Sequence, residues 1–382
     1  MFARLRACPS AVTFDVGAAG LRAAQCRRLR DRVANYTGQT LQFDRGPVAE
    51  SQAPAVQPAQ LARLLEQGGF NGRSVALVLS PPEVSFFPLR LPDQALAQPP
   101  ARLEQALKWE VARESRESAE TLEVRYWHLP RAQALHANVM AVALATETAR
   151  QWCAAFEQEG LDLRRIEVSP CALARVGREL WAPGDNDLWG VLDLGLRHAT
   201  LTLVIGEVPT YIRTLSVAPQ QWTRLLAEAF EVPVPVAEQI KRQQGLRPSW
   251  DENAQADNPS SEADLPDLCT RVLRESLRTL AHEVGRCFSY LMQSFPDHAI
   301  KGLWLAGGGA RLAGLPQLLE AELGIPVRRL ACRDQDSATT TPDPARPADT
   351  PSDLTPTPRQ QEYFEPHTAA VIGAAILDLE AP

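Results

Sequence analysis

The stretch K-G-L-W-L-A-G-G-G-A-R at residues 301–311 gives the clearest indication of how this chain folds. Its apolar part, Leu303 to Ala306, predicts a buried strand, and that strand ends in the three glycines at 307–309. A helical pattern follows from Gln317 to Leu323, with a proline before it and a glycine after it, as is typical of helix ends. Consecutive glycines let the backbone approach a flat or charged ligand, and the next helix directs free N–H groups toward it. The stretch therefore predicts either a ligand-binding turn or a plain tight turn.

The composition excludes several classes of protein. The 382 residues are enough for two or three domains, and 45% hydrophobic with 22% charged residues is typical of a globular protein. A net charge of −7 argues against nucleic-acid binding, which needs a basic face. The sequence has no long apolar run, no apolar signal-peptide core and no C-x-x-C among its seven cysteines, which favours a cytoplasmic protein with reduced thiols. It also lacks the G-x-S-x-G and P-loop patterns, so these hydrolases and NTPases are excluded.

Two Asp-x-Gly hairpins occur about half a chain apart. Asp15 and Gly17 end the first predicted strand, and Asp193 with Gly195 takes the same place in the second hairpin. This repetition suggests two related halves, although Asp-x-Gly turns are common enough to occur by chance. The strands expected around them cover residues 11–16 and 21–27 in the first half, and 189–203 and 211–217 in the second.

The remaining periodicity predicts a mixed α/β chain with a small inserted segment. Helices are expected at 58–67, 101–113, 146–159, 221–230, 236–244, 268–295 and 367–379, and strands at 75–79, 124–129 and 137–145. Residues 84–146 form an α+β insert, in whose helix we expect Trp109 to belong to the core. Residues 333–359, rich in Pro, Thr, Asp and Ser, are expected to be disordered because they carry little apolar surface.

Together these turns can hold a nucleotide. Two facing hairpins can enclose a phosphate chain with backbone N–H groups, and Asp15 and Asp193 can hold magnesium through water. Glu238 and Lys241, one helical turn apart, can bind the ribose hydroxyls and the base. Beneath the base would lie Gly307, Gly308 and Gly309. This constellation resembles the actin-like nucleotide-binding fold of actin, Hsp70 and the sugar kinases.

Within that superfamily the chain resembles most closely the PilM family of type IV pilus assembly proteins, relatives of the cell-division protein FtsA. The likeness extends from about residue 11 to 379, and its last three motifs are the most specific. The motifs are F-D-V-G at 14–17 with Arg22 where the family usually has Lys, L-K-W-E at 107–110, L-D-L-G at 192–195, Tyr211-Ile212-Arg213, A-E-x-x-K at 237–241, L-A-G-G-G-A-R-L-A-G-L at 305–315 and L-G-I-P-V at 323–327.

The resemblance implies an α/β, actin-like, two-lobed fold, a ribonuclease H-like duplicated βββαβα arrangement with a small inserted α+β subdomain. The implied domains are lobe I at 1–83 and 147–186, the insert at 84–146 as an interaction module, lobe II at 187–332, a disordered segment at 333–359, and a C-terminal helix at 360–382 that packs on lobe I.

The resemblance also implies a function. ATP with magnesium would be a structural and regulatory ligand, with hydrolysis absent or slow. The chain would be cytoplasmic and would dock the cytoplasmic tail of a PilN-like, single-span inner-membrane protein, which would hold it peripherally at the membrane; pilus motor ATPases are further candidate partners. Phe86, Phe87 and Leu89 are candidate walls of the docking groove. The implied nucleotide-binding residues are Asp15, Gly17, Arg22, Asp193, Gly195, Glu238, Lys241, Gly307, Gly308 and Gly309, with Asp15 and Asp193 also on the metal side.

Two departures from the family pattern leave alternatives open. The first phosphate loop is Ala18-Ala19-Gly20, without a hydroxyl, and Val217-Ala218-Pro219 replaces the usual Gly-Gly pair, which removes a backbone donor. A nucleotide-free actin-like adaptor of a type II secretion or MSHA-type pilus system is therefore the alternative function. A sugar or acid kinase is a remote third, because the sequence offers no Asp base. For single residues, the corresponding alternatives are that Asp15 and Asp193 cap turns, and that Glu238 and Lys241 form a surface helix pair.

Overall fold

A computed structural model of the chain describes residues 9–29, 32–42, 58–132, 137–181, 183–247, 264–330 and 366–380. The expectation of a disordered segment at 333–359 lies outside these residues. Three sheets organise the described part of the chain, two of five strands and one of three strands.

The first sheet has the strand order β3-β2-β1-β4-β8. β1, β2 and β3 form an antiparallel meander, and β4 and β8 extend it in parallel with β1. Because β1 and β4 are parallel neighbours, their carboxyl ends meet at one edge of the sheet. The strands are β1 (Val12–Gly17), β2 (Gly20–Leu29), β3 (Arg32–Gln42), β4 (Ser74–Leu79) and β8 (Asp162–Val168).

The second sheet repeats this plan with the order β11-β10-β9-β12-β13. Again three antiparallel strands are followed by two parallel ones, and β12 lies beside β9 as β4 lies beside β1. The correspondence confirms the duplication that the two Asp-x-Gly hairpins predict. The strands are β9 (Asp187–Leu194), β10 (Ala199–Ile205), β11 (Val208–Leu215), β12 (Ala299–Ala306) and β13 (Val327–Arg329).

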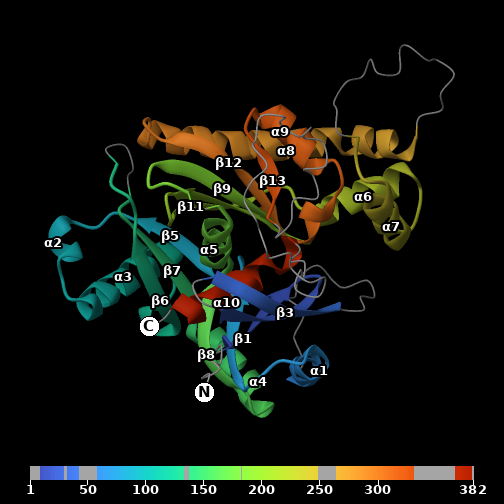
Figure 1. Cartoon of the computed structure of the whole chain (residues 1–382). Helices are drawn as coiled ribbons and strands as arrows, with labels where there is room; N and C mark the ends of the chain where they lie inside the picture. Colours follow the sequence, from blue (N-terminus) through green and yellow to red (C-terminus); the bar gives the residue numbers. More distant parts are fainter. Residues whose placement is uncertain are drawn as a thin grey trace, which may run out of the picture.

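Two helices, α5 (Ser169–Trp181) and α10 (Ala369–Glu380), lie between the two sheets (Figure 1). Their apolar side chains form one buried cluster with residues of β4, β9 and β12. The two helices pack very closely, because a Cβ on Gly373 would overlap the carbonyl oxygen of Ala172. Such close packing makes this layer rigid.

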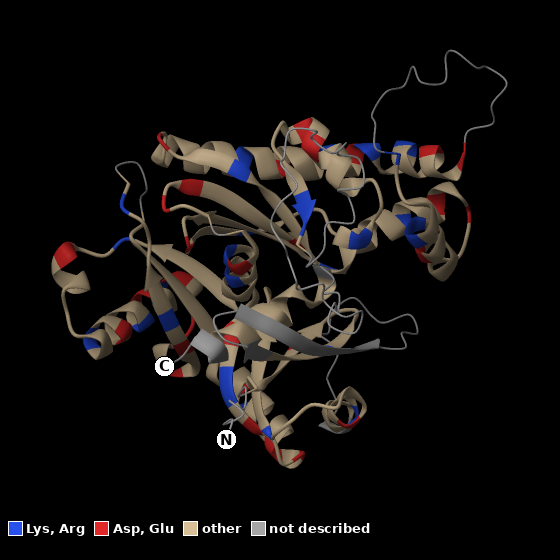
Figure 2. Ribbon diagram, viewed as in Figure 1, with Lys and Arg blue, Asp and Glu red and all other residues tan. Residues whose placement is uncertain are grey.

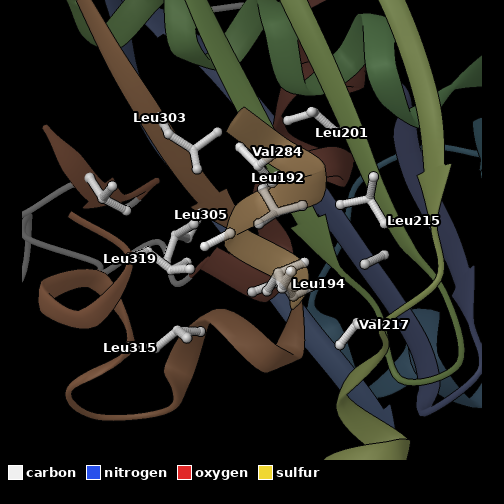
Figure 3. Close-up of a cluster of buried hydrophobic side chains, with 14 of the residues drawn as sticks. Leu192, Leu194, Leu201, Leu215, Val217, Val284, Leu303, Leu305, Leu315 and Leu319 are labelled. Atoms are coloured by element: carbon white, nitrogen blue, oxygen red, sulfur yellow. The ribbon is translucent and has the colours of Figure 1, made fainter. Parts of the chain in front are cut away.

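The outer faces of both sheets are covered by helices. On the first sheet these are α1 (Pro58–Gly68) and α4 (Thr146–Gln158). The second carries α6 (Pro219–Ala229), α7 (Val234–Gln244), α8 (Leu265–Ser294) and α9 (Leu315–Leu323). Figure 3 shows how leucines of β9, β10 and β12 meet Val284 of α8 and Leu315 and Leu319 of α9.

The strand β8 and the helix α5 are not predicted from the sequence pattern. β8 contains two charged side chains that are at least partly buried, Arg165 and Glu167, so its sequence lacks the apolar-polar alternation that indicates a strand. Arg165 of β8 donates to the carbonyl oxygen of Ala374 at 2.7 Å, and Arg175 of α5 donates both to Glu167 at 2.7 Å and to the carbonyl oxygen of Gly373 at 2.8 Å. The bonds from Arg165 and Arg175 hold α10 against β8 and α5.

The third sheet, with the order β5-β7-β6, lies to one side of the larger sheets (Figure 1). Its strands are β5 (Ser85–Leu89), β6 (Leu122–His128) and β7 (Val139–Ala145), and its helices are α2 (Asp93–Leu96) and α3 (Pro100–Ser115). Both neighbours of β7 are antiparallel to it. The sheet and α3 share a core of their own.

Charges of both signs alternate along the helices, without a large region of one sign among the described ribbons (Figure 2). Within the described residues, none of the helices combines the length and the apolar character that a membrane crossing requires.

Candidate functional site

The first corner of the candidate site is the carboxyl end of β1. Asp15 is buried there, 6% exposed, and Arg22, its cross-strand neighbour on β2, donates from Nη1 to Asp15 Oδ2 at 2.5 Å. The turn between them is short, since Gly17 pairs directly with Gly20, and a Cβ on Gly17 would lie 3.0 Å from Arg22 Nη1. Arg22 therefore neutralises Asp15 from the adjacent strand.

The second corner is the carboxyl end of β9, where Asp193 stands next to Ala306 of β12. Burial and the charge of Asp15 raise the pKa of Asp193 to about 6, although Arg22 acts in the opposite direction. Asp193 belongs to the second sheet and Asp15 to the first, so the fold brings the ends of both hairpins together. Gly195 closes the second hairpin tightly, because a Cβ there would lie 2.8 Å from the carbonyl oxygen of His198.

Glu83 is a third carboxyl of this region, and the sequence analysis missed it. It follows β4 in a turn in which its N–H donates to the carbonyl oxygen of Ser80 at 3.0 Å. Burial and the nearby charge of Asp15 raise the pKa of Glu83 to about 7. A tertiary contact, the parallel pairing of β4 with β1, brings the residues after β4 to the edge where Asp15 lies, and no local sequence signal shows this.

These groups fit a hydrated cation better than a directly bound one. Among the described residues, no three His, Cys, Asp or Glu side chains are grouped closely enough to hold a metal ion by themselves. Magnesium usually keeps several waters and binds through one or two carboxylates together with phosphate oxygens. Asp15 and Asp193 could supply such carboxylates, with the phosphates coming from a nucleotide.

The third corner is the glycine turn after β12. Gly307 has a φ of 79°, and a Cβ there would overlap Asp193 Oδ1. Gly309 is equally confined, since a Cβ would lie 2.5 Å from Pro219 Cγ. Gly308, between them, is exposed, and no atom of the described residues lies within 4 Å of its Cβ position. Packing fixes the two outer glycines, and the middle one faces open space.

The fourth corner is the pair Glu238 and Lys241 on α7. Lys241 Nζ lies 2.6 Å from Glu238 Oε2 and 2.6 Å from Thr223 Oγ1 on α6. Burial alone would raise the pKa of Glu238, but the Lys241 charge and the hydrogen bonds it accepts hold it below its usual range. The two side chains are thus bound to each other and to α6. Because Pro219 starts α6 and packs on Gly309, this corner adjoins the glycine turn.

The small sheet is a second candidate surface. Phe86 is half-buried between the cores of both lobes and contacts Trp127 edge-on at 6.3 Å, whereas Leu89 is buried in the small sheet's own core. Phe87 is also half-buried and packs on the core of the small sheet, so the two phenylalanines are the expected wall residues that solvent can reach. Trp127 Nε1 donates to the carbonyl oxygen of Pro209 on β11 at 2.7 Å, which attaches the small sheet to lobe II.

The expectation that Trp109 is a core residue is wrong, because its indole is 63% exposed. The buried face of α3 is set by Leu103, Leu107 and Val111, spaced by four residues. Trp109 follows Leu107 by two positions and so lies on the opposite side of the helix. Its indole therefore faces solvent and not the core of the small sheet.

Trp127→Phe is expected to lower the free energy of unfolding by about 1 kcal/mol, because it keeps an aromatic ring but leaves the Pro209 carbonyl without its donor. Urea unfolding followed by far-UV circular dichroism measures this. Trp152→Phe on α4 is the matched control, since Trp152 packs on Phe156 within lobe I and the change breaks no contact between the small sheet and lobe II. Equal losses in both variants would contradict the expectation.

Comparison with known proteins agrees with this geometry. Two sheets of the same strand order, separated by two helices and carrying an Asp-bearing hairpin each, define a protein of the actin-like ATPase fold. The sequence model of the type IV pilus assembly protein PilM matches residues 128–331, more than half of the chain. The chain belongs to this family.

Solved structures support the fold. The PilM–PilN type IV pilus biogenesis complex is similar with a TM-score of 0.70 and 21% identity over 97% of this chain and 99% of that chain. Ethanolamine utilization protein EutJ from Carboxydothermus hydrogenoformans is similar with a TM-score of 0.50 and 14% identity over 98% of this chain and 92% of that one. No curated protein matches the sequence.

Proposed function

We propose that this PilM-family protein binds ATP with magnesium between its two lobes, as a structural and regulatory ligand, with hydrolysis absent or slow. The observation that carries the proposal is the meeting of four separate segments at one place: the ends of β1 and β9 with Asp15 and Asp193, the glycine turn at 307–309, and the α6–α7 pair next to it. Carboxylates for a hydrated cation and an open glycine for a flat base are the groups that Mg-ATP requires.

Isothermal titration with ATP, with and without magnesium, tests this binding. Saturable binding that Asp193→Ala abolishes and Glu238→Ala weakens is the expected result, because the first variant removes a metal-side carboxylate and the second a ribose acceptor. Glu228→Ala on α6 is the matched control, an exposed carboxylate outside the four corners. No heat at millimolar ATP in the wild type would overturn the proposal.

The nucleotide-free adaptor remains the alternative function, and two observations favour it. The turn after β1 is Ala18-Ala19, which offers no hydroxyl to a phosphate. The ammonium of Lys241 already donates to acceptors within the protein. A thermal unfolding temperature that Mg-ATP leaves unchanged would support the adaptor, because a ligand at 100 times its Kd stabilises the folded state by about 2.7 kcal/mol.

We further propose that the chain docks the cytoplasmic tail of a PilN-like inner-membrane protein, which would hold it peripherally at the cytoplasmic side of the membrane. The similar solved complex contains PilN beside PilM. An extended tail in a groove gains main-chain hydrogen bonds and a few side-chain pockets, and the residues 84–146 are where we place that groove. The half-exposed Phe87 is its candidate wall residue.

Titration of the full chain with a synthetic peptide of such a tail tests the docking. Phe87→Ala is expected to weaken binding, and Trp109→Ala, on the far face of α3, is expected to leave it unchanged. The reverse pattern would move the docking surface to α3, and no loss in either variant would remove it from the small sheet.

A further inference from the structure

The helix pair α6–α7 contains a buried polar cluster that the proposed nucleotide site uses only in part. Thr223 lies on α6 one turn after Pro219, and Glu238 and Lys241 lie on α7. Thr223 is 3% exposed and Lys241 is 7% exposed. Buried polar groups are usually hydrogen-bonded to other protein atoms, so the contacts of these side chains indicate their structural role.

The ammonium of Lys241 has an acceptor for each of its three protons. Its Nζ lies 2.6 Å from Thr223 Oγ1, 2.6 Å from Glu238 Oε2 and 3.3 Å from the carbonyl oxygen of Pro219. An ammonium has three donors and no acceptor, so none is left for a ligand. Lys241 therefore serves to hold α7 on the first turn of α6.

Thr223 links the two partners of this ion pair. Its hydroxyl accepts from Lys241 and donates to Glu238 Oε2 at 2.6 Å, while the other acceptor within reach, the carbonyl oxygen of Pro219, is farther away at 3.3 Å. One hydroxyl proton makes one strong hydrogen bond, and a bond to a carboxylate is stronger than a bond to a carbonyl.

The two oxygens of Glu238 consequently differ. Oε2 receives two buried donors, from Thr223 and Lys241. Among the residues that the structure describes, the one donor to Oε1 is Arg242 Nε at 2.7 Å, from a side chain that is 65% exposed. An exposed ion pair is weak and readily exchanged, so Oε1 is the oxygen that a hydroxyl of a ligand can reach.

We propose that Thr223 is a positioning residue of the nucleotide site, which together with Lys241 fixes Oε2 of Glu238 so that Oε1 accepts hydrogen bonds from the ribose hydroxyls. The inference rests on the proposed ATP binding and deepens it, because it assigns ribose recognition to one oxygen and makes Lys241 a support and not a ligand. The packing of Pro219 on Gly309 places this cluster beside the glycine turn.

The test compares ATP with 2′,3′-dideoxy-ATP, which lacks both ribose hydroxyls, by titration in the presence of magnesium. The wild type is expected to bind ATP about tenfold more tightly, as a hydrogen bond to a charged acceptor allows. Thr223→Val keeps the shape but removes the hydroxyl, so it is expected to lower ATP affinity to that of the dideoxy analogue while the affinity for the analogue stays unchanged. Thr223→Ser restores the hydroxyl and is expected to restore the preference.

A purely structural role would weaken the binding of both nucleotides equally, and that result overturns the inference. So does a Thr223→Val protein that keeps the tenfold preference. If the Thr223→Val protein does not fold, Thr223→Ala replaces it, because alanine introduces no new atoms. The same results then support or overturn the inference. A wild type that binds both nucleotides equally overturns the inference alone, whereas a wild type that binds neither overturns the proposed function as well.

Discussion

Gly307→Ala is expected to destabilise the protein by about 3 kcal/mol or more, whereas Gly308→Ala, one residue further, is expected to leave stability nearly unchanged. Gly307 combines a φ of 79° with close packing: a Cβ would overlap Asp193 Oδ1 and lie 2.7 Å from the carbonyl carbon and oxygen of Leu194. Backbone atoms cannot move aside as a flexible side chain can, so strain and overlap add. Around Gly308, the described part of the chain places no atom within 4 Å of the Cβ position, and its φ lies outside the left-handed region.

Urea unfolding followed by circular dichroism compares the two variants, and Gly308→Ala is the matched control because it makes the same chemical change in the same turn. Equal stabilities would show that packing does not fix Gly307 in this turn.

A third variant separates the effect on stability from the effect on ATP binding. Gly308→Leu, whose side chain extends into the open space, is expected to leave the protein folded and to lower ATP affinity about tenfold, a loss of about 1.4 kcal/mol.

Asp193→Asn is expected to stabilise the protein at pH 8 while it removes Mg-ATP binding. In the folded protein the pKa of Asp193 is raised from 3.8 to about 6 by burial and by the charge of Asp15. The unfolded chain therefore loses its proton first as pH rises, and folding stability falls between about pH 4 and pH 6. Two pKa units correspond to about 3 kcal/mol, present as a penalty above pH 6 and absent below pH 4. Asparagine cannot ionise and escapes this penalty.

Urea unfolding of both proteins at several pH values measures the effect. The stability difference is expected to be near zero at pH 4, to grow through pH 6 and then to stay constant. Asp187→Asn on the same strand is the matched control and is expected to lower stability, because Asp187 pairs with Lys301 at 3.3 Å and accepts from the Gly184 N–H at 2.8 Å. An Asp193→Asn protein that is less stable than the wild type at pH 8 would contradict the described environment of Asp193.

Local sequence determined much of this protein. Apolar runs and glycine or proline boundaries predict most of the helices and strands, since these signals lie within a few neighbouring residues. The repeated Asp-x-Gly hairpin predicts the duplication, and the observed strand orders confirm it. The resemblance to the PilM family is confirmed by the family match over residues 128–331. The nucleotide-binding residues stay a prediction, although the fold brings both aspartates, Arg22 and the glycine turn to one region.

Contacts between distant segments could not be read from neighbouring residues. Glu83 joins the acidic region only because β4 pairs with β1. β8 is not predicted because its Arg165 is turned inward and donates to a carbonyl of a helix about 200 residues away. Spacing makes Glu238 and Lys241 neighbours on a helix, but only tertiary structure adds Thr223 and thereby separates an oxygen bound inside the protein from one open to a ligand. The sequence thus determined which elements form and which family they build, because those signals are local. Tertiary structure decided which side chains share a site, because burial, charge and hydrogen bonding act between segments that meet only in the fold.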